Sequence, residues 1–331
     1  MNRVLQGVPC LGSENDQFLS PIAALAAALQ SEGLHTDYGS LMCLGGGAFR
    51  ACWSSEWLAR CAVACSEDII ANAAATQGFA ATTRVHDDEE EAWSEIISSV
   101  GSGLPLLTCG LAGRVDWTVI AGYEEEPRTL LFKGRQNESP ETHAHKFESW
   151  RGWTYGGDGQ MPLTTLKRVG RVMDDVDAFR ANLERAVRFD GEGEFEIRDM
   201  AGRVVRFHSG ARAYTAWADD VLSMAAGGES EKYAERARLT GLNVAAIIDA
   251  RRAAIADMEK FKRRGTRQIY DLTVAADRYA REVLALQEAA TLAPETSKIK
   301  ECSAAIQRAG EEEGKAVAAL SRVLKQLPIP K

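Results

Sequence analysis

The chain has 331 residues, of which 45% are hydrophobic and 26% charged, a globular composition that excludes a disordered or fibrous protein. Its 39 basic and 47 acidic residues give a net charge of −8, which argues against a general binder of nucleic acid or anionic membranes. From Ala211 onward there are 20 basic and 17 acidic residues, which leaves 19 basic and 30 acidic residues before that point. The length and this asymmetry predict two domains, residues 1–210 and residues 211–331.

Nothing in the sequence indicates export or membrane insertion. The first residues lack the charged and apolar regions of a signal peptide, and no apolar stretch approaches the roughly 20 residues of a membrane span. The seven cysteines are an odd number and their spacing indicates no disulfide framework. We therefore expect reduced thiols in a bacterial-type cytoplasm.

Helix and strand signals are mixed in the first 210 residues. Ser20 and Pro21 predict a helix start, with Ser20 as N-cap and the helix ending at Gly33. Further helices are expected near residues 54–64, 67–77, 87–100 and 176–189. Short β-rich runs at residues 104–109, 116–123, 129–133 and 166–173, and a hairpin of residues 195–197 and 204–207, predict strands.

After Gly210 the strand signals end. Residues 211–224, 233–263, 266–290 and 295–327 show helical apolar spacing, which predicts an antiparallel helical bundle. Because helices and strands come in blocks rather than in regular alternation, the predicted fold class is α+β.

Several short motifs suggest chemistry but are better explained structurally. The glycines at 45–47 lack the Lys-Ser/Thr of a phosphate loop, so a tight turn is the preferred interpretation. Cys61 and Cys65 lack the spacing of a zinc site, and no acid or cysteine completes a site with His143 and His145. We therefore predict no metal and no cofactor.

Ser20 and the strand beginning at Asp116 form the strongest constellation in the sequence. A nucleophile at a helix N-terminus gains from the positive end of the helix dipole, and its general base typically comes from a distant strand. This layout is that of papain-like enzymes.

Three segments carry a more specific resemblance. The run SPIAALAAAL from Ser20, with Gly33 after it, resembles the first helix of the bacteriocin-processing (double-glycine) peptidase-like superfamily. Residues 41–50 resemble the next segment in proteins like the N-terminal domain of butirosin biosynthesis protein H, and residues 116–123 resemble that superfamily's His-Trp-x-Val-x-x-Gly-Tyr strand. Residues 210–217 are similar to the helical region that follows this domain. The resemblance implies a papain-like cysteine-peptidase fold followed by antiparallel helices.

The chain departs from this pattern at the positions that carry the chemistry. Ser20 replaces the nucleophilic cysteine, Asp116 replaces the histidine, and Glu14 stands where a glutamine would supply an oxyanion-hole amide. The segment of residues 132–135 lacks the aspartate that orients the histidine. A carboxylate is a much weaker base than imidazole near pH 7, so peptidase activity is not expected.

The leading hypothesis is a pseudoenzyme that binds a small molecule or peptide in the former catalytic cleft. The residues expected to line that cleft are Asp16, Ser20, Arg50, Asp116 and Trp117, with Glu14 nearby. One alternative is an acyltransferase or amide-forming biosynthetic enzyme that uses another thiol, Cys10 or Cys109. A second alternative is an interaction protein that forms a homodimer through its helical region; neither nucleic acid nor a membrane is expected as a partner.

Overall fold

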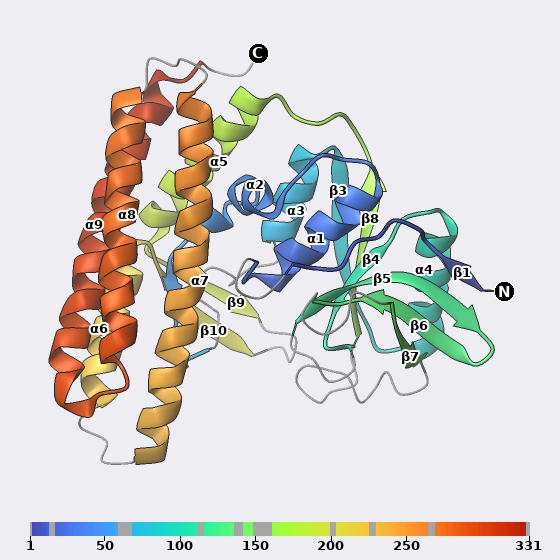
Figure 1. Ribbon diagram of the computed structural model, residues 1–331, viewed down its shortest axis with the longest axis horizontal. Helices are drawn as coiled ribbons and strands as arrows, with labels where there is room; N and C mark the ends of the chain where they lie inside the picture. Colours follow the sequence, from blue (N-terminus) through green and yellow to red (C-terminus); the bar gives the residue numbers. More distant parts are fainter. Residues whose placement is uncertain are drawn as a thin grey trace. The chain divides into compact units, whose positions relative to one another are not determined.

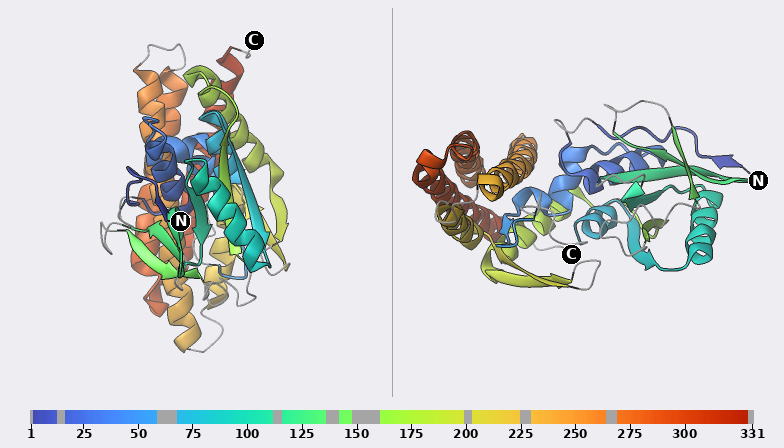
Figure 2. Two further views of the ribbon diagram at one scale, coloured as in Figure 1. Left: turned by 90° about the vertical axis from the view of Figure 1, so that its right-hand side faces the viewer. Right: turned by 90° about the horizontal axis from the view of Figure 1, so that it is seen from below.

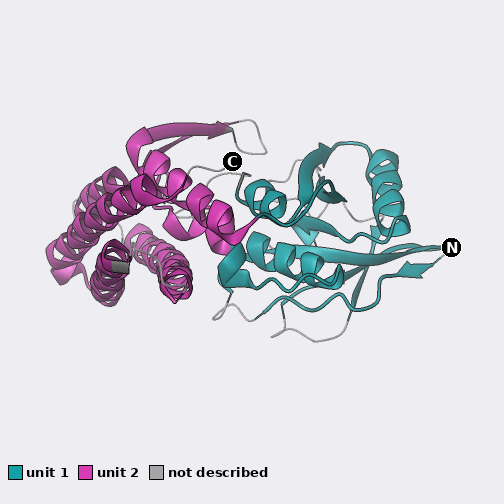
Figure 3. Cartoon of the chain, turned by 90° about the horizontal axis from the view of Figure 1, so that it is seen from above, with its two compact units in different colours: residues 1–41, 67–173 teal, residues 42–66, 174–331 magenta. Residues whose placement is uncertain are grey.

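The chain forms two compact units in the computed structural model, which describes residues 2–12, 17–58, 68–111, 116–135, 142–147, 161–198, 203–224, 230–263 and 269–328. Unit 1 consists of Met1–Leu41 with Glu67–Met173, and unit 2 consists of Met42–Ser66 with Asp174–Lys331 (Figure 3). Both units are therefore discontinuous in sequence, and the chain passes from one to the other three times.

Unit 1 is built on a seven-stranded antiparallel sheet of order β3-β8-β4-β5-β6-β7, with β1 paired to β5 (Figure 1). The strands are β1 (Arg3–Val4), β3 (Phe79–His86), β4 (Leu106–Cys109), β5 (Trp117–Glu125), β6 (Arg128–Lys133), β7 (His143–Lys146) and β8 (Met161–Arg168). The central strands β4 and β5 are buried on both faces, which explains their nearly continuous apolar runs.

Helices cover both faces of this sheet. They are α1 (Ser20–Ser31), α3 (Asp68–Thr76) and α4 (Glu89–Gly101), and the short α2 (Tyr38–Leu44) spans the boundary between the units. In Figure 2, α1 and α4 lie on opposite faces of the strands. Every residue of α1 from Ile22 to Leu29 is buried, so its alanines allow close packing on the sheet. The N-cap of α4 is Asp88, whose carboxylate accepts bonds from the backbone N–H groups of Glu90 and Glu91.

Unit 2 combines a small sheet with long helices. The antiparallel sheet has the order β2-β10-β9, from β2 (Cys52–Trp53), β10 (Val204–Ser209) and β9 (Glu194–Arg198). Its helical elements are η1 (Gly47–Phe49), α5 (Asp175–Glu192), α6 (Ala211–Met224), α7 (Ser230–Lys262), α8 (Ile269–Leu292), η4 (Thr296–Lys298) and α9 (Ile299–Gln326). Segment 42–58 packs in this unit, so its apolar residues are part of the core of unit 2.

A buried network of charges joins three helices of unit 2 to η1. Arg251 on α7 is fully buried and donates to Glu282 on α8 and to Glu313 on α9, each at 2.8 Å. The same guanidinium donates to the carbonyl oxygens of Ala48 at 2.7 Å and Arg50 at 3.2 Å. Arg251 thus satisfies backbone groups of the η1 segment that would otherwise be buried without a donor.

The protonation of this network follows from its charges. Burial, followed by the negative charge of Glu282, raises the pKa of Glu313 well above its usual range, although Arg251 opposes the shift. Tyr214 also donates to Oε1 of Glu282, whereas Oε2 of Glu282 lacks a donor when both carboxylates are ionised. A protonated Glu313 can supply that donor, because its raised pKa favours the neutral carboxyl group.

The structure confirms the α+β class, the hairpin β9–β10, and the four helices after Gly210. The compact units are divided differently from the predicted domains at residue 210, because α5, β9, β10 and segment 42–58 pack with the C-terminal helices. The predicted domain boundary at residue 210 therefore stays a prediction, and it does not coincide with the boundary between the compact units.

Some local predictions differ from the structure. The strand expected at residues 166–173 lies earlier in the chain, as β8 (Met161–Arg168), and residues 169–173 are not in a strand. Residues 54–58 form a turn instead of the start of a helix, and the rest of the helix expected near residues 54–64 lies outside the described residues. Cys52 is disulfide-bonded, so the expectation of reduced thiols is wrong for this residue, whereas Cys10, Cys43, Cys109 and Cys302 are not disulfide-bonded. Among the described residues, no helix is both long and apolar enough to cross a membrane. The cytoplasmic location remains a prediction.

Candidate functional site

The structure brings the two predicted catalytic positions together in unit 1. Ser20 is the first residue of α1 and is buried, and its Oγ accepts a hydrogen bond of 3.1 Å from the backbone N–H of Trp117 at the start of β5. The N-cap is Leu19, not Ser20 as predicted, and no side chain caps this helix. The Ser20 hydroxyl therefore contacts a strand 97 residues later instead of its own helix.

Asp116 lies next to this contact and is paired with a buried arginine. Nε and Nη2 of Arg135 each lie 3.4 Å from a carboxylate oxygen of Asp116. The side chain of Asp116 is 27% exposed, whereas that of Arg135 is only 5% exposed. A carboxylate held by a buried cation is a poor acceptor for a hydroxyl proton, so this pair does not activate Ser20 as a nucleophile.

Arg135 also fixes the segment that precedes α1. Its Nη1 donates to the carbonyl of Gln17 at 2.7 Å, and its Nη2 donates to that of Phe18 at 3.2 Å. Leu11 forms a bridge with Arg135 and donates its N–H to Gly134 at 3.0 Å. The Arg135 side chain, just after β6, thus contacts both Asp116, the residue before β5, and the segment that immediately precedes Ser20.

Removing one partner of this pair should lower the stability of unit 1. In Asp116→Asn, Arg135 keeps its carbonyl acceptors but loses its only acidic partner among the described residues, so we expect a cost of about 1–3 kcal/mol. Asp87→Asn, at an exposed loop position, is the control and should cost less than about 0.5 kcal/mol. Urea unfolding measures both values, and equal stability of the two variants would contradict a structural role for the pair.

The two alternative thiols lie close to this site in the fold. Cys109 on β4 is the cross-strand partner of Trp117, and Cys10 precedes Leu11 at its bridge to Arg135. Burial raises the pKa of Cys109 to about 12, so this residue is a neutral thiol at physiological pH and a weak nucleophile.

The remaining predicted residues are Arg50, Glu14 and Asp16. Arg50 belongs to unit 2, where its guanidinium lies 4.9 Å from the centre of the Phe189 ring. Glu14 and Asp16 lie outside the described residues. Sequence reasoning missed Arg135, because a single arginine after a strand carries no motif. It also missed the Gln17 amide, which accepts a 2.8 Å bond from the Gly12 N–H.

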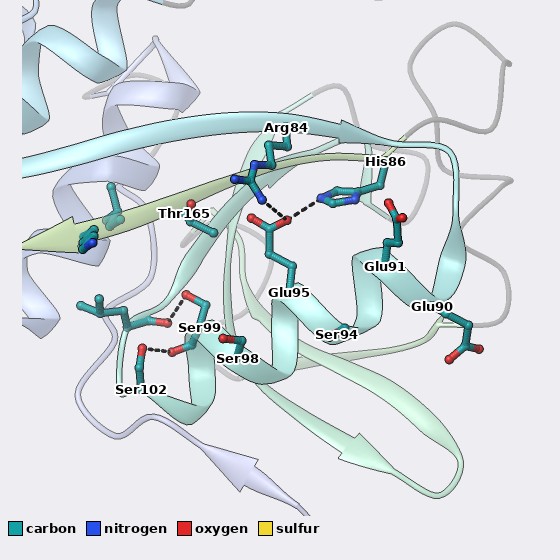
Figure 4. Close-up of a pocket in the computed structure, with 13 residues that line it drawn as sticks. Arg84, His86, Glu90, Glu91, Ser94, Glu95, Ser98, Ser99, Ser102 and Thr165 are labelled. Carbon is teal, nitrogen blue, oxygen red and sulfur yellow. Dashed lines mark hydrogen bonds and ion pairs between the residues drawn. The ribbon is translucent and has the colours of Figure 1, made fainter.

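A second feature of unit 1 is an open groove of about 920 Å³ between α4 and the β3–β8 side of the sheet (Figure 4). It is lined by polar and charged side chains and a few aliphatic ones: Arg84, His86, Glu90, Glu91, Ser94, Glu95, Ser98, Ser99, Ser102, Leu104, Thr165, Leu166 and Lys167. Nothing in the sequence singled out this groove, because its walls come from segments more than 80 residues apart in the chain.

A close acid–imidazole contact lies within the groove. Nε2 of the buried His86 is 2.6 Å from Oε2 of Glu95, and Arg84 approaches the same oxygen at 4.0 Å (Figure 4). Ser99 and Ser102 donate to backbone carbonyls near the end of α4. Among the described residues, no three His, Cys, Asp or Glu side chains are grouped as a metal site requires.

Comparisons with known proteins give no family assignment for this chain. No protein-family model matches the sequence, and no curated protein matches it either.

Proposed function

We propose that the chain contains a degenerate papain-like domain, which binds a small molecule or peptide where a peptidase would hold its substrate. The observation that carries the proposal is the contact between Ser20 Oγ and the Trp117 N–H. Two segments that were paired from sequence alone, as nucleophile helix and base strand, meet at hydrogen-bond distance. An antiparallel sheet with a buried helix against its central strands agrees with the same fold.

The chemistry of these side chains favours ligand binding over catalysis. Asp116 stands where a base would act, yet it is paired with Arg135, and Ser20 has no imidazole beside it among the described residues. The Ser20 hydroxyl can still donate its proton, and the part-exposed carboxylate of Asp116 can accept hydrogen bonds. Such a pair suits recognition of an amide, whose C=O can accept from Ser20 and whose N–H can donate to Asp116.

Introducing the cysteine and histidine of the resembled superfamily tests the fold assignment. The double variant Ser20→Cys with Asp116→His places an imidazole beside the new thiol. We expect iodoacetamide to label the peptide that contains position 20 at least about tenfold faster at pH 7 in this variant than in Ser20→Cys alone. Peptide-level mass spectrometry separates this site from the seven native cysteines. Circular dichroism must show both variants folded. Equal labelling rates would mean that the two positions do not form a peptidase-like pair.

Ligand protection tests the binding function itself. A dipeptide amide titrated against the Ser20→Cys variant should slow iodoacetamide labelling in a saturable way, because an occupant covers the sulfur. Adding Asp116→Ala should abolish the protection, which is measured in each variant relative to its own labelling rate without ligand. Labelling that is insensitive to dipeptide amides and to other small amides would contradict a binding site here.

A further inference from the structure

The charges that line the groove between α4 and the β3–β8 strands are not all neutralised. Glu90 receives two hydrogen bonds from Arg128, at 2.6 and 2.8 Å, which lower its pKa. Glu95 is paired with His86 and Arg84. Among the described residues, this leaves one acid, Glu91, and one base, Lys167, with no ion-pair partner in the lining.

These two charges stand at opposite ends of the groove. Glu91 lies one helical turn before Glu95, whose carboxylate contacts His86, and His86 is the cross-strand partner of Met161 at the beginning of β8 (Figure 4). Lys167 lies six residues further along β8, which at about 3.3 Å per residue places it roughly 20 Å away. The groove is therefore negative at the start of α4 and positive at the far end of β8.

The surface between these ends offers hydrogen bonds but no aromatic stacking. The hydroxyls of Ser94 and Ser98 follow each other one helical turn apart along α4, and Thr165 lies on the strand side (Figure 4). No Phe, Tyr or Trp is among the described lining residues, so a sugar ring or a nucleobase would find no flat partner. Hydroxyl groups spaced along an open groove match the alternating N–H and C=O groups of an extended backbone.

We propose that this groove binds a short extended peptide by its two charged ends, the terminal ammonium at Glu91 and the terminal carboxylate at Lys167. About five extended residues span roughly 17 Å, which leaves room for the two side chains to reach the termini. The serine and threonine hydroxyls contact the peptide backbone, so recognition depends on length and free termini more than on sequence.

The groove is independent of the Ser20 site. The groove lies beside α4, and α1 with Ser20 lies on the opposite face of the same sheet (Figure 2). Substitutions at Glu91 or Lys167 therefore leave the Ser20–Trp117 contact in place. Loss of one binding activity with retention of the other separates the two proposals.

Calorimetry with the pentapeptide Ala-Gly-Ser-Gly-Ala tests the proposal at low salt. The peptide with free ends should bind with 1:1 stoichiometry, and N-acetylation or C-amidation should each weaken it about three- to tenfold. Glu91→Gln should weaken the free peptide by a similar factor but leave the N-acetyl peptide unaffected. Lys167→Gln should weaken the free peptide while leaving the C-amide peptide unaffected.

Matched controls remove equal charges outside the lining. Asp87→Asn precedes α4 and Arg171→Gln follows β8, and neither residue lines the groove. Both variants should bind the free peptide like the unchanged protein. The proposal is overturned if the free peptide does not bind, if blocked peptides bind equally well, or if only one of the two ends affects affinity.

Discussion

Arg251→Met is expected to destabilise unit 2 by about 3–5 kcal/mol, the largest effect of any single substitution considered for this protein. The guanidinium lies at 0% exposure between Glu282 and Glu313, so its loss leaves buried acidic groups without a cation. The carbonyls of Ala48 and Arg50 lose their donor at the same time. Urea unfolding followed by near-ultraviolet circular dichroism, which reports the stacked rings of Trp53 and Trp217, measures the change.

The adjacent residue provides a matched control for this prediction. Arg252 is exposed, and Arg252→Met makes the same chemical change one position away, so it should alter stability by less than about 0.5 kcal/mol. Equal changes in the free energy of unfolding for the two substitutions would show that the buried ion pairs of Arg251 add no stability beyond that of an exposed arginine on α7.

Glu313→Gln is expected to remove a pH-dependent contribution to the stability of unit 2. In the folded chain the pKa of Glu313 lies well above its usual range because of burial, then the charge of Glu282. The unfolded chain releases this proton near the ordinary pKa of about 4.3, whereas the folded chain retains it. Stability from this group is thus fully present below the unfolded pKa and falls by about 1.4 kcal/mol per pH unit until the folded pKa is reached.

A glutamine at position 313 has the shape of a protonated glutamate and removes this dependence. The variant should be at least as stable as the unchanged protein at pH 7, and its advantage should shrink as pH falls towards 4.5. Glu282→Gln is the contrasting variant, since it removes the carboxylate that pairs with Arg251 and should destabilise unit 2. Urea titrations at several pH values give the slopes, and a Glu313→Gln variant that follows the unchanged slope would refute the assignment of the proton.

Local signals in the sequence predicted the four helices after Gly210 and several of the strands, and motif resemblance predicted one long-range contact. Helix α6 has the predicted bounds, because apolar spacing coincides with Gly210, whose φ of +57° suits glycine at a helix boundary. The pairing of the Ser20 helix with the Trp117 strand was predicted through motif resemblance, and these residues meet. The papain-like fold of the whole domain and its binding function stay predictions.

Other parts of the structure had no local signal. Arg251, Glu282 and Glu313 occupy helix positions whose spacing gives no warning that charged side chains are buried together. Arg135 contacts residues 117 to 123 positions earlier in the chain, and no pattern within one segment can indicate such partners. Periodicity identifies which face of an element is apolar, but not which distant element supplies a counter-charge.

The discontinuous course of unit 2 has a consequence for how the protein is made. Arg251 contacts the Ala48 carbonyl across 203 positions, so segment 42–58 leaves the ribosome long before the helices that cover it. Phe49, Trp53 and their neighbours have no completed core until α7, α8 and α9 have been translated. A nascent chain stalled at residue 210 would expose this apolar segment, which makes it a target for ribosome-associated chaperones. Synthesis of the two halves as separate polypeptides should therefore yield aggregation of the first half unless the second is present.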